Sequence, residues 1–256
     1  EQILTSVASG RKWSDHAILY RMNAMSNSIE RALVKNAIPY RIIGGHKFYD
    51  RAEIRDMHAY LNVINNTADS TRLKRIINVP KRGIGDSTIN KAAEIADTLG
   101  VSMFEVLKTA DEYEILKRAA GKLSEFAEMI ENLISLSETM PLAELLDNIL
   151  DRTKYIDYLR LDPEKCEDRI ENINELKANL VRYQDDNENG TLNDYLEEIA
   201  LLTDIDNYNS GEDAVVMMTL HSAKGLEFPV VFIPGMEEGV FPGMQSMYNE
   251  TEVEEE

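Results

Sequence analysis

The sequence is poor in the residues that build disulfides, metal centres and membrane spans. Among its 256 residues Cys166 is the only cysteine, which excludes an internal disulfide and is typical of a reducing cytoplasm. The four histidines are scattered at 16, 46, 58 and 221, so no Cys/His cluster has the spacing of a zinc site. No apolar run approaches the roughly 18 residues of a membrane helix, and the first residues show no signal-peptide pattern. We therefore expect neither a metal site nor a membrane partner.

The charge of the chain is acidic overall but unevenly distributed. The net charge of −19 at pH 7 argues by itself against nucleic acid, because two polyanions repel each other. Residues 1–91, however, contain 15 of the 27 Lys and Arg and 8 of the 46 Asp and Glu, a net charge of +7, which leaves −26 for residues 92–256. Such asymmetry indicates a charged partner for the basic segment. The acidic segment has a simpler interpretation as a solvated helical surface.

The hydrophobic pattern predicts an α/β fold. With 43% hydrophobic residues the chain can bury a core, and its length suits two domains. Strand–helix alternation at the start of the chain predicts a parallel sheet, with helices at 27–37 and 51–64. Short apolar runs predict the buried strands, which are His16–Arg21, Tyr40–Ile43, Ala214–Leu220 and Val230–Ile233.

A helical region interrupts this α/β pattern. From Asp69 to Asp204 the hydrophobic period is helical almost throughout, and Asp206–Asp213 then forms a polar linker. The economical interpretation is an α/β domain formed by residues 1–66 and 212–256, interrupted by an inserted all-helical domain of residues 67–211. The clearest helices of the insertion are 123–136, 142–150, 166–183 and 191–202.

The segment Thr219–Phe228, TLHSAKGLEF, is the strongest functional signal. It follows a predicted strand, and ligand sites of parallel sheets lie beyond the carboxyl ends of the strands. Gly225 permits a turn, and the candidate binding residues are His221, Ser222, Lys224 and Glu227. The alternative is an ordinary polar connection. The phosphate-cradling pattern GxxxxGK[ST] is absent from the sequence, so this segment does not bind a triphosphate unaided.

The segment 78–88, NVPKRGIGDST, predicts an anion site between two helices. Gly83 and Gly85 let backbone N–H groups approach a phosphate, and a following helix capped by Asp86 adds its dipole. Lys81 and Arg82 would neutralise phosphate charge, so we expect a grip on the duplex backbone with little base specificity. The alternative is a helix–helix connection with a C-cap glycine.

Two weaker signals follow the first two strands. Tyr20 has the chemistry to stack on a base and Arg21 to reach a phosphate, although such a pair also occurs as packing plus surface. Gly44–Phe48 combines a sharp turn, an aromatic residue and a cation at Lys47, as single-strand binding surfaces do. A simple strand exit is the alternative for this second segment.

Four segments in this order resemble the C-terminal half of UvrD/Rep/PcrA-type superfamily 1 ATP-dependent DNA helicases. They are AILYRMNAMSNSIERAL (17–33), YRIIGGHKFYDRAEIRD (40–56), INVPKRGIGDSTI (77–89) and VMMTLHSAKGLEFPVVFIPGMEEGVFP (216–242). Together they span the chain, and the last is highly specific for this family. The resemblance implies a RecA-like, P-loop NTPase-type sheet domain with a large helical insertion. It would be the second of two RecA-like motor domains, between which ATP binds.

The resemblance also implies roles for individual residues. On the nucleotide side Tyr20 would stack on adenine, and Arg21 would contact the γ-phosphate as a catalytic residue. Gly225 and Glu227 would complete this side of the site. On the DNA side His221, Ser222 and Lys47 would contact the single strand. The duplex-gripping Gly-Ile-Gly element would consist of Lys81, Arg82, Gly83, Gly85 and Thr88.

Other parts of such a helicase are expected outside this sequence. The Walker A loop, the Asp/Glu magnesium motif (Walker B) and the first RecA-like domain would precede Glu1. An arginine motif would follow the acidic run 252–256. We therefore expect ATP with Mg²⁺ to bind only together with the N-terminal half, and this chain alone not to hydrolyse ATP.

The function implied for the parent protein is 3′–5′ translocation and duplex unwinding in repair or replication. Its expected partners are single-stranded DNA, single/double-strand junctions and its own N-terminal RecA-like domain, in a bacterial, nucleoid-associated cytoplasmic setting. One alternative is a stand-alone duplex-DNA-binding module, which would have no need of Tyr20, Arg21 and Glu227. Another is an acidic helical interaction domain, which the +7 segment disfavours.

Overall fold

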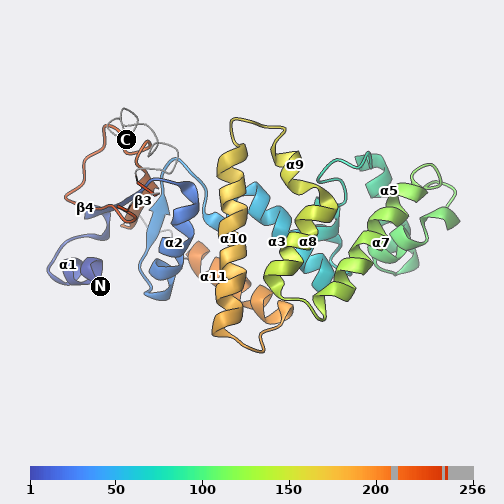
Figure 1. The fold of residues 1–256 in the computed structure, drawn as a ribbon, viewed down its shortest axis with the longest axis horizontal. Helices are drawn as coiled ribbons and strands as arrows, with labels where there is room; N and C mark the ends of the chain where they lie inside the picture. The colour runs from blue at the N-terminus through green and yellow to red at the C-terminus, as the bar shows by residue number, and fades with distance from the viewer. Residues whose placement is uncertain (209–212, 238–239, 242–256) are drawn as a thin grey trace. The chain divides into compact units, whose positions relative to one another are not determined.

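The structure, a computed structural model, describes residues 1–208, 213–237 and 240–241 (Figure 1). It divides into two compact units. The sheet unit consists of Glu1–Arg51 and Ile199–Glu256, and the helical unit consists of Ala52–Glu198. The expected insertion, residues 67–211, therefore differs from the structural division at both of its ends.

The sheet unit contains the parallel sheet that the apolar runs predict. The sheet order is β2-β3-β1-β4 and all pairs are parallel, with Tyr20 opposite Thr219 and Ile42 opposite Met217. β3 is buried over Val215–Met218, as expected of a strand inside a parallel sheet. The predicted α/β class is confirmed. The strands are β1 His16–Tyr20, β2 Tyr40–Ile42, β3 Val215–Thr219 and β4 Val230–Phe232.

Helix α2, Ser26–Lys35, packs its apolar face on this sheet. Leu33 of α2 joins Ile18 and Met217 of the strands in one buried cluster. α1, Gln2–Ala8, precedes the sheet, and Ile3 packs against the same cluster. Short 3-10 turns complete the unit, namely η1 Trp13–Asp15, η2 Asn23–Met25 and η3 Phe48–Asp50.

The helical unit is built around α3, Ala52–Asn65. One face of α3 is fully buried, and it packs against α4, α7, α8 and α10. This packing explains why α3, expected in the α/β domain, belongs to the helical unit. The other helices are α4 Ser70–Ile76, α5 Asp86–Leu99, α6 Met103–Lys108, η4 Ala110–Glu112, α7 Ala120–Ser137, α8 Leu142–Thr153, α9 Tyr155–Leu159 and α10 Cys166–Asp186.

Helix α11, Leu192–Tyr208, begins in the helical unit and ends in the sheet unit. It includes the first residues of the predicted polar linker, and residues 209–212 of that linker lie outside the described part of the chain. Among the described residues, no helix has both the length and the apolarity to cross a bilayer.

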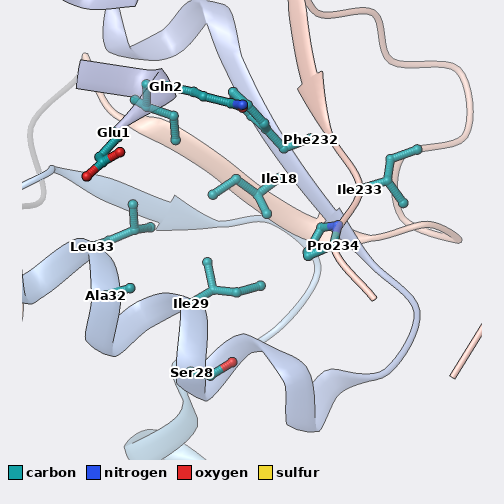
Figure 2. Close-up of a pocket in the computed structure, with 11 residues that line it drawn as sticks. Glu1, Gln2, Ile18, Ser28, Ile29, Ala32, Leu33, Phe232, Ile233 and Pro234 are labelled. Atoms are coloured by element: carbon teal, nitrogen blue, oxygen red, sulfur yellow. The ribbon is translucent and has the colours of Figure 1, made fainter. Parts of the chain in front are cut away.

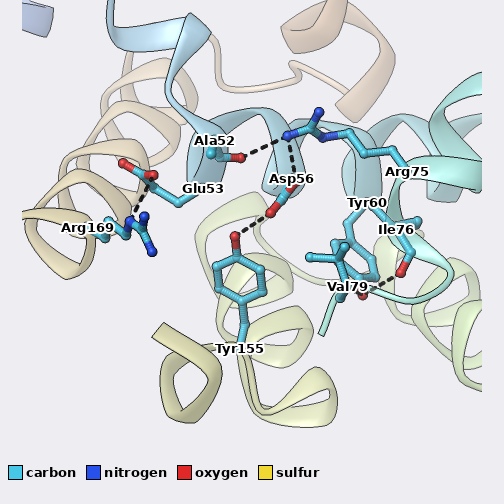
Figure 3. A network of polar contacts seen from close by, with 9 residues as sticks. All are labelled: Ala52, Glu53, Asp56, Tyr60, Arg75, Ile76, Val79, Tyr155 and Arg169. Atoms are coloured by element: carbon cyan, nitrogen blue, oxygen red, sulfur yellow. Dashed lines mark hydrogen bonds and ion pairs between the residues drawn. The ribbon is translucent and has the colours of Figure 1, made fainter. Parts of the chain in front are cut away.

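A buried polar network fastens the first two turns of α3 to the neighbouring helices (Figure 3). Asp56 accepts a hydrogen bond from the Tyr155 hydroxyl of α9 (2.6 Å) and pairs with Arg75 of α4 (2.7 Å). Glu53 accepts a hydrogen bond from the Asn172 side chain of α10 (2.6 Å). Burial, and after it the Asp56 carboxylate, raise the pKa of Tyr155, so the phenol stays a donor.

Candidate functional site

The predicted nucleotide and single-strand residues follow the carboxyl ends of three adjacent parallel strands. Arg21 comes directly after β1, and Gly44 comes two residues after β2. Ser222 lies in the turn that follows β3. Because the strands are parallel and paired in register, these loops all leave the same edge of the sheet.

The loops that follow β2 and β3 touch each other. Gly44 has a φ of +75°, and a Cβ added there would lie 2.8 Å from the Ser222 Oγ. The Ser222 hydroxyl is itself held, because its oxygen lies 3.0 Å from the Thr219 Oγ1, which also accepts the Ser222 N–H at 3.2 Å. A glycine is therefore required where the two loops meet. His221, beside Ser222, is exposed.

A buried carboxylate that the sequence analysis missed holds the β2 loop. Glu30 of α2 accepts hydrogen bonds from the Ser26 hydroxyl (2.6 Å), the Tyr40 hydroxyl (3.1 Å) and the Phe48 N–H (3.3 Å). Burial raises the pKa of Glu30, against these hydrogen bonds. Phe48 follows Lys47, whose ammonium lies 5.5 Å from the centre of the Tyr40 ring. Glu30 thus fixes the segment that carries the predicted single-strand contact.

The turn after β3 presents its predicted residues to solvent. Gly225 has a φ of +84° and no atom within 4 Å of an added Cβ, so the turn needs glycine for its backbone alone. Glu227 is exposed, and so is Lys224. Arg21, at the neighbouring strand end, is half-buried.

Tyr20 does not share this exposure. The residue is 1% exposed and belongs to the apolar cluster of the sheet unit. Burial, and after it the charge of Glu30, raise the pKa of Tyr20 to about 12. The predicted stacking on adenine requires an open ring face, so that role would need the ring to be uncovered.

An apolar groove of about 640 Å³ lies elsewhere on the sheet unit (Figure 2). Ile18 of β1, Ile29 and Leu33 of α2, and Phe232 of β4 line it, together with residues of the first helix. None of the predicted nucleotide or DNA residues is among its lining residues. The candidate site is therefore the loop edge and not this groove.

The predicted anion element of the helical unit lies between α4 and α5. Asn78 organises it, because its Oδ1 accepts the backbone N–H groups of Arg82 (2.8 Å) and Ile84 (3.2 Å). Gly83 has a φ of +70°, which favours glycine. The N-cap of α5 is Gly85, without a side-chain cap, and Asp86 is the first helical residue. The expectation that Asp86 caps this helix is wrong.

Several backbone N–H groups of this loop are available to a ligand. Within the described part of the chain, the N–H groups of Gly83, Gly85 and Ser87 donate to no protein acceptor. These residues are exposed, as is Lys81. The Thr88 N–H is already bonded to the Gly85 carbonyl at 2.9 Å. The arrangement offers donors and a cation to an anion such as a phosphate.

Arg82 is placed differently from Lys81. Its Nη1 donates to the carbonyl oxygens of Ile76 (3.0 Å), Ile77 (3.3 Å) and Pro80 (3.3 Å). Its Nη2 donates to the Tyr60 hydroxyl (2.8 Å), and the guanidinium lies 5.1 Å from the centre of the Phe126 ring. This inward placement differs from the expected role of Arg82 in phosphate neutralisation.

Lys122 of α7 is a second cation at the loop. Its ammonium donates to the Gly83 carbonyl at 3.3 Å, and a Cβ added at Gly83 would lie 2.5 Å from the Lys122 Nζ. The side chain is exposed. Sequence analysis missed it because 39 residues separate it from Gly83 and no local motif surrounds it.

Comparison with known sequences identifies the family of the chain. The UvrD-like helicase C-terminal domain family matches residues 1–256, so the chain belongs to this family. Similar proteins include the ATP-dependent DNA helicase PcrA of Bacillus subtilis (strain 168), which is 44% identical over 253 residues, 96% of this chain and 34% of the relative.

Two staphylococcal relatives are similar at nearly the same level. The ATP-dependent DNA helicase PcrA of Staphylococcus epidermidis (strain RP62A) is 41% identical over 261 residues, 100% of this chain and 36% of the relative. That of Staphylococcus aureus (strain Mu50) is 40% identical over 256 residues, 99% of this chain and 35% of the relative. The chain spans about a third of the length of the curated relatives it matches.

Proposed function

We propose that the sheet unit is the second RecA-like motor domain of an ATP-dependent DNA helicase, and that the helical unit grips duplex DNA. The parent would translocate 3′–5′ along a single strand, in repair or replication in the bacterial cytoplasm at the nucleoid. The observation that carries the proposal is the contact of the loops after β2 and β3. Gly44 admits Ser222 at the sheet edge where Arg21 also lies.

One loop serves both ligands in this proposal. The turn after β3 would contact the single strand through His221 and Ser222, and the nucleotide through Gly225 and Glu227. His221 and Glu227 are six residues apart in the connection between β3 and β4, so a movement of this connection on nucleotide binding would also move the residues that contact the strand. Lys47 precedes Phe48, whose N–H is bonded to Glu30, and would add a cation to the surface that contacts the single-stranded DNA.

The residues present fit only one side of an ATP site. Arg21 would contact the γ-phosphate, where an arginine neutralises transferred charge. The sequence has no GxxxxGK[ST] loop to cradle the phosphates. ATP with Mg²⁺ supplies the phosphoryl-transfer chemistry when bound, with its phosphate cradle and metal ligands coming from the parent's N-terminal RecA-like domain.

Steady-state ATP hydrolysis by the parent helicase with single-stranded DNA tests this proposal. We expect Arg21→Ala to lower kcat by about 10³-fold, the lower end for loss of an arginine finger, with single-strand affinity kept. Arg41→Ala, an exposed arginine on β2, is the matched control and should leave kcat unchanged. The 256-residue chain alone should show no turnover. Turnover by the chain alone, or a wild-type kcat for Arg21→Ala, would contradict the proposal.

A stand-alone duplex-binding module is the second candidate. It is favoured by one observation: the loop at Gly83–Gly85 and all its supports lie within the helical unit. Glu227→Ala distinguishes the motor function from the stand-alone binding module. If the parent is a motor, this substitution should abolish its translocation along the single strand and leave duplex binding intact. A module without motor activity would show no effect of this substitution on any DNA-dependent reaction.

A further inference from the structure

The neighbouring cations Lys81 and Arg82 face different surroundings. Arg82 reaches three carbonyl oxygens and one phenol, so its guanidinium bridges the end of α4 to α3. Tyr60 on α3 is 0% exposed and receives one of these bonds. The same hydroxyl donates to the Val79 carbonyl at 2.6 Å. Arg82 and Tyr60 therefore clamp the segment that leads into the loop.

A lysine cannot substitute for this clamp. A guanidinium presents a planar fork of five donors, which suits several acceptors in fixed directions at once. An ammonium has three donors on a flexible stem and acts on a phosphate as a point charge. Either side chain at residue 82 could contact a phosphate, but only arginine could bridge the four protein oxygens.

Arg82 points inward, so its charge is not presented at the loop surface. Lys122 provides a cation there instead. Its Nζ lies beside Gly83, and only the absence of a side chain at residue 83 leaves it room there. Neither Lys122 nor Lys81 forms an ion pair with a carboxylate among the described residues. Lys117, five residues before Lys122 in the sequence, instead pairs with Glu114 at 2.7 Å. The charge of an exposed lysine that pairs with no carboxylate is available to neutralise a phosphate.

We propose that Lys81 and Lys122 are the cation pair that binds the duplex backbone, and that Arg82 with Tyr60 positions the loop between them. The inference rests on the proposed duplex grip and deepens it. The ligand is a DNA phosphate backbone, contacted without base specificity by two lysines from α7 and the α4–α5 loop and by the N–H groups of Gly83, Gly85 and Ser87. Arg82 and Tyr60 act through the loop and do not touch the DNA.

Fluorescence anisotropy of the 256-residue chain with a fluorescein-labelled duplex bearing a 3′ single-stranded tail, over a salt series, tests the proposal. We expect Lys122→Ala to weaken binding about tenfold and to reduce the log–log salt slope by about 0.9, the value of one phosphate contact. Lys117→Ala makes the same change of charge five residues earlier in the sequence and should alter neither quantity by more than about twofold.

Residue 82 separates a positioning role from a direct contact. We expect Arg82→Lys to bind as weakly as Arg82→Ala, and Tyr60→Phe to weaken binding about fivefold without any change of charge. The effect of Tyr60→Phe should vanish in the Arg82→Ala background, because the two side chains act as one clamp. A purely structural role would lower thermal stability and leave the affinity of the folded chain unchanged.

The outcomes distinguish this inference from the proposed function. If the wild-type chain shows no salt-dependent binding to the duplex, the duplex grip itself is wrong and the inference falls with it. If the wild type binds but Lys122→Ala is unchanged, or Arg82→Lys restores wild-type affinity and slope, only the division of roles is overturned. Circular dichroism of each variant confirms that it is folded before its affinity is compared.

Discussion

Replacing Asp56 perturbs the network that holds α3 in the helical unit. The residue is 6% exposed and accepts two charge-assisted bonds, from the Tyr155 hydroxyl (2.6 Å) and from Arg75 (2.7 Å). Removing one partner of a buried ion pair costs about 3–5 kcal/mol, because the other charge is left uncompensated. Arg75 is 31% exposed and keeps some water, so the lower end of that range applies.

We therefore expect Asp56→Ala to lower the free energy of unfolding of the helical unit by about 3 kcal/mol. Tyr155→Phe leaves the ion pair with Arg75 intact and should cost about 1.5 kcal/mol, the value of one hydrogen bond to a charged group. Asp157→Ala on α9 is the control. Asp157 pairs with Arg160 at 3.0 Å, but both are exposed, so its loss should cost no more than about 0.5 kcal/mol.

Urea unfolding followed by two probes measures these changes. Far-UV circular dichroism is dominated by the helices, whereas Trp13, the only tryptophan, reports on the sheet unit. The dichroism transition should move in Asp56→Ala while the Trp13 fluorescence transition stays in place. A loss below about 1 kcal/mol, or a loss equal to that of Asp157→Ala, would refute the argument that this buried charge depends on its two partners.

Two further predictions concern a glycine and a histidine. Gly44→Ala should destabilise the sheet unit more than Gly10→Ala does, as measured by the unfolding transition of Trp13 fluorescence. Both glycines have a positive φ (+75° and +101°), but of the two only Gly44 has an atom, the Ser222 Oγ, in the way of an added Cβ. Equal losses would show that only backbone strain matters. Burial, and after it the charge of Arg72, lower the pKa of His58 to about 4. The unfolded chain, with a histidine pKa of about 6.5, binds this proton first, so the helical unit should be fully stable above that pH and lose stability as the pH falls towards 4. His58→Gln should flatten this dependence, and an imidazole NMR titration midpoint near 6.5 would contradict the prediction.

The strands and most helices were predictable because their signals are local. A buried parallel strand excludes polar side chains from both faces, so β1 and β3 appear as short apolar runs. The amphipathic period of α3 predicts a helix equally well. It does not say which unit the apolar face meets, and for that reason the expected insertion begins at residue 67, whereas the helical unit of the structure begins at Ala52.

The site was only partly predictable because exposure is a tertiary property. The motifs correctly indicated which loops lie at the carboxyl ends of the strands. They did not show that Tyr20 is buried or that Arg82 turns towards carbonyl oxygens. Glu30 and Lys122 carry no local signal for their roles at the two loops, since the Phe48 N–H and the Gly83 carbonyl that they contact lie 18 and 39 residues away. Such contacts follow from the packing of whole elements and leave no pattern in a short window of sequence.

Helix α3 joins the stability of the helical unit to the shape of its DNA-binding loop. Asp56 and Tyr60 are four residues apart, so they lie on one face of the helix, a turn from each other. The first fastens α3 to α4 and α9, and the second receives Arg82 beneath the loop. Burial raises the pKa of Tyr60 to about 12; the Arg82 guanidinium opposes this rise, and the charge of Asp56 adds to it to a smaller extent. The loop therefore keeps its geometry only while the face of α3 that carries both residues stays docked.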